Sequence, residues 1–213
     1  MRSLWPLPAN PWPHGMVISV DDLPHPVIEL LFIRSAWGIA QDLELPALDP
    51  QPRAGNSAVP ETASRDDWSQ RWKHQWQRIW DWYVIHDPGI HPTQEQLRSM
   101  SRPGQPLNSI FPPFWAAEHG DAGIDHDALR DWENLLMPRH LRHSLEEEPE
   151  RVCLPALIKA WETGIEEIVT PPYAGYFAQR LSRKVLVVSA ATRADPGLYK
   201  RALDMASSAA PGT

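Results

Sequence analysis

The segment from residue 64 to residue 85 constrains the fold most, because four tryptophans recur there at every fourth position: Trp68, Trp72, Trp76 and Trp80. At about 100° per residue, these rings share an arc of about 120° with Ile79 and Tyr83, which is the width of a core-facing helical stripe. Ser64 and Asp67 have the spacing of a capping box. The pattern predicts an amphipathic helix from Ser64 to Ile85 whose tryptophan stripe forms a wall of the core.

An exposed aromatic surface is the alternative use of so much tryptophan. The chain holds 11 Trp residues, and exposed rings typically bind a partner helix, a proline-rich segment or a sugar. Trp82 lies about 40° outside the stripe, so it is the ring of this helix that we expect in solvent. Phe114 and Trp115 follow an irregular stretch. We therefore predict interaction residues at Trp82, Phe114 and Trp115.

Two short apolar segments near opposite ends of the chain predict β-strands. Residues 16–20 are rich in β-branched side chains and precede an acidic turn, whereas residues 184–189 hold a continuous apolar run. Two strands alone are marginal, so we expect them to pair with each other or with a third segment near residues 110–115. The predicted fold class is α+β, a helix-dominated single domain with a small sheet covered by helices.

Capping signals and apolar periodicity predict the remaining helices. Residues 26–38 read as a buried helix, with a strand as the alternative. The other expected helices cover about residues 93–100, 125–138, 154–168, 170–181 and 195–206. In this interpretation Thr170 and Pro171 begin a helix that carries Tyr173, Phe177 and Leu181.

Prolines define the predicted organisation, because 23 of them interrupt the chain. We expect a proline-rich N-terminal arm over residues 1–15 and a single globular domain over residues 16–206. Irregular loops are predicted at 45–63 and 101–114, and a flexible tail at 207–213. The segment 45–63 is the expected place for disorder.

Charge and cysteine content narrow the function classes. The net charge is −7 and the basic residues are scattered, so nucleic acid is not an expected partner, whereas a basic partner would be favoured. The lone cysteine, Cys153, predicts a small buried side chain and a reducing compartment. No apolar run has the length of a membrane span. We predict a soluble cytoplasmic protein, and the 16 Arg against 4 Lys favour a bacterial source.

The common catalytic signatures are absent from the sequence, including a P-loop, G-x-G-x-x-G, H-E-x-x-H, C-x-x-C and G-x-S-x-G. The best candidate for chemistry is a group of imidazoles and carboxylates, which together suit Zn, Mn or Fe. Its members are His86, Asp87, His91, Glu118, His119, Asp121 and His126. The spacing matches no known metal motif, and solvated loops and helix caps explain the same residues.

The leading functional hypothesis is a non-enzymatic protein-interaction module, of an accessory or immunity type, that binds another protein. It requires no cofactor. The alternative is a metal-dependent enzyme, such as a hydrolase, that holds a divalent metal in the histidine and carboxylate group. A carbohydrate-binding role for exposed tryptophans comes third.

Overall fold

The computed structural model describes residues 12–86, 111–137 and 147–208. By its contacts the chain divides into two compact units. Unit 1 comprises residues 1–24, 46–51 and 134–213, and unit 2 comprises residues 25–45 and 52–133. The single domain predicted over residues 16–206 thus consists of two units, the first of them assembled from segments far apart in the sequence.

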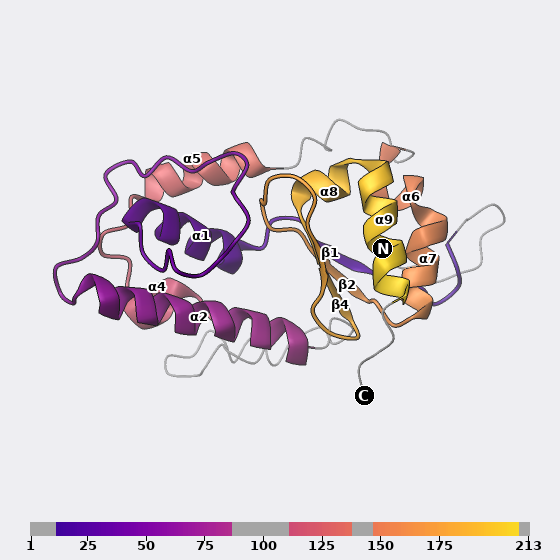
Figure 1. The fold of residues 1–213 in the computed structure, drawn as a ribbon, viewed down its shortest axis with the longest axis horizontal. Coiled ribbons are helices and arrows are strands. Elements are labelled where there is room, and N and C mark those ends of the chain that lie inside the picture. Colours follow the sequence, from indigo (N-terminus) through magenta and orange to yellow (C-terminus); the bar gives the residue numbers. More distant parts are fainter. Residues whose placement is uncertain (1–11, 87–110, 138–146, 209–213) are drawn as a thin grey trace, which may run out of the picture. The chain divides into compact units, whose positions relative to one another are not determined.

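A four-stranded mixed sheet forms the centre of unit 1 (Figure 1). Its strands are β1 (Ser19–Asp21), β2 (Glu167–Val169), β3 (Ala178–Arg180) and β4 (Val185–Val188). The order across the sheet is β1-β2-β4-β3, with parallel pairs β1/β2 and β2/β4 and an antiparallel pair β3/β4. The predicted strands near 16–20 and 184–189 are therefore confirmed as β1 and β4, and β2 lies between them.

Helices cover one face of this sheet. The apolar faces of α7 (Leu154–Glu162) and α9 (Pro196–Ser208) pack on Ile18, Ile168 and Leu186 in one continuous core. Two short helices complete the unit: α6 (Pro149–Val152) and α8 (Ala190–Ala194). This arrangement confirms the predicted α+β class, a helix-dominated fold with a small sheet.

Two predicted helices of unit 1 were wrong in extent or in kind. The helix expected over 154–168 ends at Glu162, because Gly164 adopts a φ of 105°, where a side chain would be strained. Ile165 and Ile168 stay in the core, but from a turn and from β2. The segment 170–181 forms no helix and contains β3 instead. Thr170 is buried, and its backbone N–H and hydroxyl both donate to the Asp21 carbonyl.

The third strand also lies elsewhere than predicted. Residues 111–114 are not in a strand, and the helix α4 (Trp115–His119) begins directly after them. Position 110 lies outside the described residues. The strand that joins β1 to β4 is β2, which periodicity had assigned to the end of a helix.

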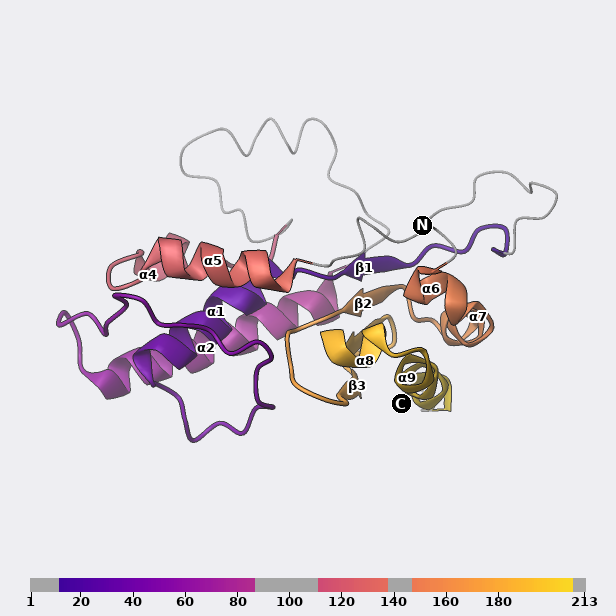
Figure 2. The ribbon, with the colours of Figure 1, turned by 90° about the horizontal axis from the view of Figure 1, so that it is seen from above.

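Unit 2 is built from helices. In both views, α1 (His25–Trp37) lies between α2 (Arg65–Ile85) and α5 (His126–Leu136) (Figures 1 and 2). The helix predicted at 26–38 is confirmed, as is the one opened by Asp125, whose carboxylate accepts the Ala128 N–H at 3.1 Å. Ser64 caps α2 and completes the predicted capping box with Asp67.

The tryptophan stripe forms the core of unit 2, as predicted. Trp68, Trp72 and Trp76 are buried, and Trp72 stacks on Trp76 with ring centroids 5.1 Å apart. The Trp72 indole N–H donates to the Leu30 carbonyl at 2.7 Å, which joins α2 to α1. Trp80 is only partly buried, so the stripe reaches the surface at its C-terminal end.

The loop predicted at 45–63 contains no helix or strand, and its side chains are exposed or partly buried, but residues 55–58 lie close against the start of α5. A Cβ on Gly123 would lie 2.2 Å from the Ala58 carbonyl oxygen, and one on Gly55 would lie 2.5 Å from the Asp125 carboxylate. These approaches hold the loop against the start of α5 and argue against disorder there.

Several predictions fall on residues that the structure does not describe. They concern residues 1–11 of the arm, the helix over 93–100, most of the loop 101–114 and residues 209–213 of the tail. Positions 207 and 208, placed in the predicted tail, belong to α9. Among the described residues, no helix combines the length and apolarity needed to cross a membrane.

Candidate functional site, a charged pocket in unit 1

The candidate site lies beside the carboxyl ends of the parallel strands, where open sheets commonly bind ligands. Asp22 directly follows β1. Ser189 directly follows β4 and caps α8, because its hydroxyl accepts the Thr192 N–H at 3.0 Å. The short helix α8 then places Arg193 on the same side as Asp22, and the Arg193 Nη1 atom lies 3.8 Å from the Asp22 Oδ2 atom.

A buried ion pair forms the floor of this site. Arg193 donates from Nε and Nη2 to the two carboxylate oxygens of Glu150, at 2.8 and 2.9 Å. The Tyr199 hydroxyl donates to the same carboxylate at 3.1 Å. Glu150 is 5% exposed and Arg193 is 8% exposed. Such two-pronged pairing fixes both side chains, and it offsets the cost of removing two charges from water.

The protonation states of this floor follow from its geometry. Burial disfavours the Arg193 cation, but the hydrogen bonds and charge of Glu150 outweigh burial and raise the pKa of the guanidinium. Burial, followed by the charge of Glu150, raises the pKa of Tyr199 well above its ordinary value. Tyr199 therefore stays a neutral donor, and Arg193 stays charged.

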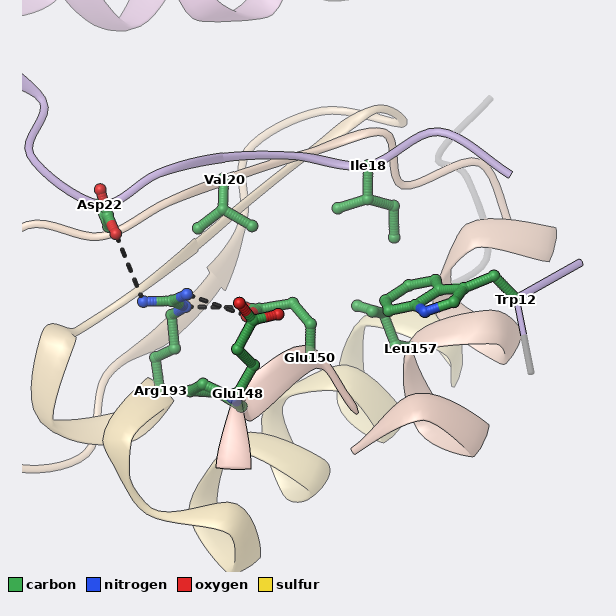
Figure 3. A pocket seen from close by; sticks show the side chains of 9 residues that line it. Trp12, Ile18, Val20, Asp22, Glu148, Glu150, Leu157 and Arg193 are labelled. Carbon is green, nitrogen blue, oxygen red and sulfur yellow. Dashed lines mark hydrogen bonds and ion pairs between the residues drawn. The ribbon is translucent and has the colours of Figure 1, made fainter. Parts of the chain in front are cut away.

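A pocket of about 270 Å³ opens above the ion pair (Figure 3). One side of it is charged, with Asp22, Glu148, Glu150 and Arg193, and the opposite side is apolar. Figure 3 shows the side chains of Val20 and Ile18 pointing from the β1 segment into the pocket, with the Trp12 ring and Leu157 at its far end. The pocket therefore combines a polar anchor with an apolar channel, as small-molecule and side-chain sites do.

Glu148 lines the pocket, and one of its two carboxylate oxygens has no hydrogen-bond partner among the described residues. It occupies the N-cap position of α6, yet its side chain makes no capping hydrogen bond. Its Oε2 atom is buried and accepts no hydrogen bond from the part of the chain that the structure describes. Because an unpaired carboxylate oxygen shielded from water is costly, Glu148 gains most from a donor placed in the pocket.

The charge balance of the lining decides which ligand fits. Three carboxylates face one guanidinium, and that guanidinium is already bound to Glu150 and lies near Asp22. An anion would meet uncompensated negative charge, whereas a cation would neutralise it. The arrangement suits a cationic group carried on an apolar stem.

The structure does not gather the predicted metal residues that it describes into one group. His86 ends α2 and stacks on Trp82, with ring centroids 4.0 Å apart. Glu118 forms an ion pair with Arg78, and His126 lies 3.6 Å from Asp121.

His119 packs against Trp115 with ring centroids 4.4 Å apart, and burial lowers its pKa. Asp87 and His91 lie outside the described residues, so their part in a metal site stays a prediction. Within the described ranges, no cluster of three or more His, Cys, Asp or Glu side chains is placed to hold a metal ion.

The predicted interaction residues differ in exposure. Phe114 is 36% exposed, and Trp82 is partly buried beside His86. Trp115 is 1% exposed and packs against Trp37 with ring centroids 5.8 Å apart. Trp115 thus belongs to the core of unit 2, which speaks against the surface role predicted for it.

Sequence reasoning missed the pocket. It placed Trp12 in the N-terminal arm and the residues after position 20 in an acidic turn, and it singled out neither Glu150 nor Arg193. The one usable signal was position, because polar residues that directly follow buried parallel strands often line sites. To use this position, one must know that β2 lies between β1 and β4 in the sheet. The helical spacing of Ile165 and Ile168 concealed β2, because it predicted a helix there.

Comparison with known proteins identifies no relative that indicates a function. No protein-family model matches the chain, and no curated protein or solved structure matches it either.

Proposed function

We propose that this protein is a non-enzymatic binding module for a basic partner protein, and that the unit 1 pocket is its recognition site. The observation that carries the proposal is the acidic side of the pocket, where the buried Glu148 Oε2 atom has no hydrogen-bond partner among the described residues and lies with two other carboxylates, Asp22 and Glu150, and one already paired guanidinium. A partner that inserts a cation would supply the missing hydrogen bond.

Two other side chains of unit 1, Glu150 and Cys153, favour binding over catalysis. Both Glu150 oxygens are engaged by Arg193, so this carboxylate has a structural role. Burial, and then the charge of Glu150, raises the pKa of the Cys153 thiol, which makes it a poor nucleophile. A net charge of −7 would in addition steer a basic protein toward the chain.

The proposal is tested by capture from a native lysate on the immobilised full chain. Wild type is compared with Glu148→Gln, which removes the charge that faces the pocket, and with Glu147→Gln, an exposed neighbour that does not line it. We expect wild type and Glu147→Gln to retain the same basic protein in stoichiometric amount, and Glu148→Gln to lose most of it. Retention of no stoichiometric protein, or equal retention by Glu148→Gln, overturns the proposal.

A further inference from the structure

We infer that the unit 1 pocket is a subsite for one primary alkylammonium group, supplied by a lysine side chain of the partner. This inference rests on the proposed function and adds the chemistry of recognition. A lysine side chain is a compact cation on a stem of four methylenes, and the pocket offers an acidic end and an apolar channel in the matching order.

The acidic end suits an ammonium group better than a second guanidinium. A guanidinium binds best to two parallel carboxylate oxygens, and both oxygens of Glu150 are already taken by Arg193. Glu148 presents a single buried oxygen that has no donor among the described residues, which matches a point charge with freely rotating donors. A guanidinium ligand would also lie against the Arg193 cation.

The apolar channel suits the stem. Ile18 and Leu157 belong to the buried core, and Val20 and Trp12 pack against that core while remaining partly buried. Methylenes laid along these side chains would leave water without any rearrangement of the core. The Trp12 indole adds a ring at the far end of the pocket, where it can cover the stem.

Three small probes separate charge from shape in the test. They are Nα-acetyl-lysine methylamide, the norleucine analogue with a stem of similar length and no charge, and the arginine analogue. Binding to the full chain is followed by titration calorimetry and by amide chemical shifts. We expect the lysine probe to bind at least tenfold more tightly than the norleucine and arginine probes, with shifts around Val20, Glu148 and Leu157.

Two variants make the result specific to the pocket. Glu148→Gln should weaken the lysine probe at least tenfold, whereas Glu147→Gln should leave its affinity within twofold of wild type. Thermal melts of both variants check that the fold is retained. A third variant, Trp12→Ala, shortens the apolar wall and should weaken the binding of the lysine and norleucine probes by the same factor. Failure of the lysine probe to bind, equal binding of norleucine, or an unchanged affinity in Glu148→Gln overturns the inference.

The outcomes distinguish this inference from the function on which it rests. If the lysate partner is captured through Glu148 but the lysine probe does not bind, the binding function stands and the lysine subsite falls. A free amine is the other source of the same chemistry, and 1,5-diaminopentane tests it. Tighter binding of the diamine than of the lysine probe would overturn the assignment to a side chain.

Discussion

Individual carboxylates in unit 1 have very different surroundings, although sequence alone shows them as similar acidic residues. Glu150 is buried with two hydrogen-bonded partners, Arg193 and Tyr199. Glu167 is buried in the central strand β2, and its Oε2 atom has no hydrogen-bond partner within the described ranges. Burial, and then the nearby charge of Asp21, raises the pKa of Glu167 from its ordinary value of 4.5 to about 7.

The raised pKa of Glu167 predicts a pH-dependent stability. The folded protein holds this proton more tightly than the unfolded chain, so the stabilisation is complete below about pH 4.5 and is lost as the pH rises through about 7. Between pH 5 and 8 we expect wild type to lose roughly 2 to 3 kcal/mol of unfolding free energy relative to Glu167→Gln. Urea unfolding across this range measures the difference.

The neighbouring Glu166 provides the control for Glu167. Glu166 pairs at the surface with Lys184 at 3.0 Å, so Glu166→Gln should retain the pH profile of wild type. Parallel profiles for wild type and Glu167→Gln would show that Glu167 is ionised in the folded state.

Residue roles in the pocket were beyond sequence reasoning for a physical reason. Glu148 and Glu150 lie in an acidic run that equally predicts a solvated helix start, and only the fold decides which side chain turns inward. Arg193 lacks any local pattern, because its partners Asp22 and Glu150 are distant in the sequence. Cys153 was predictable, since a lone cysteine between apolar residues is usually buried, and it is 5% exposed.

At the scale of elements, the helix α2 was predictable because its signals are local. The capping box, the tryptophan period and the stop after Ile85 all lie within the segment itself. The strand β2 was not, because three residues have no period of their own and gain stability only from β1 and β4. Ile165 and Ile168 continue the helical spacing of apolar residues past Gly164, so the sequence predicted a longer helix. In the structure the chain turns at Gly164 and enters the sheet as β2.

The tryptophan stripe of α2 predicts a graded response to truncation. Trp72 is fully buried and hydrogen bonded to Leu30, so Trp72→Ala should cost about 3 to 5 kcal/mol. Trp82 is partly buried on the same helix, so Trp82→Ala should cost about 1 kcal/mol. Chemical denaturation measures both. Similar losses for the two variants would contradict the division of α2 into a buried stripe and a surface ring.

At the scale of the whole molecule, each unit has an apolar core of its own. The core of unit 1 joins α7 and α9 to the sheet, whereas that of unit 2 joins α1, α2, α4 and α5 through tryptophans. The division into two units could not be predicted from the sequence, because the proline-rich loop at 45–63 does not mark a boundary between one unit before it and another after it. Residues 46–51 belong to unit 1, whereas residues 52–133 belong to unit 2.

Separate cores predict that a lesion in one unit is felt mainly there. Glu150→Gln removes the charge of the carboxylate that Arg193 binds through two hydrogen bonds, which should cost about 3 to 5 kcal/mol. Native-state hydrogen exchange should then accelerate in β1, β2, β4 and α9, with smaller changes in α1 and α2. Equal acceleration in both units would show that they open as one cooperative structure.

The pairing of β1 with β2 has a consequence for biosynthesis. Ser19 is aligned with Glu167, so a ribosome must translate all of unit 2 before the first strand can find its neighbour. Until β2 has been made, the segment before β1 waits with Ile18 and Val20 uncovered. The nascent chain is thus vulnerable at these apolar residues, and a chaperone that shields them would act before translation ends.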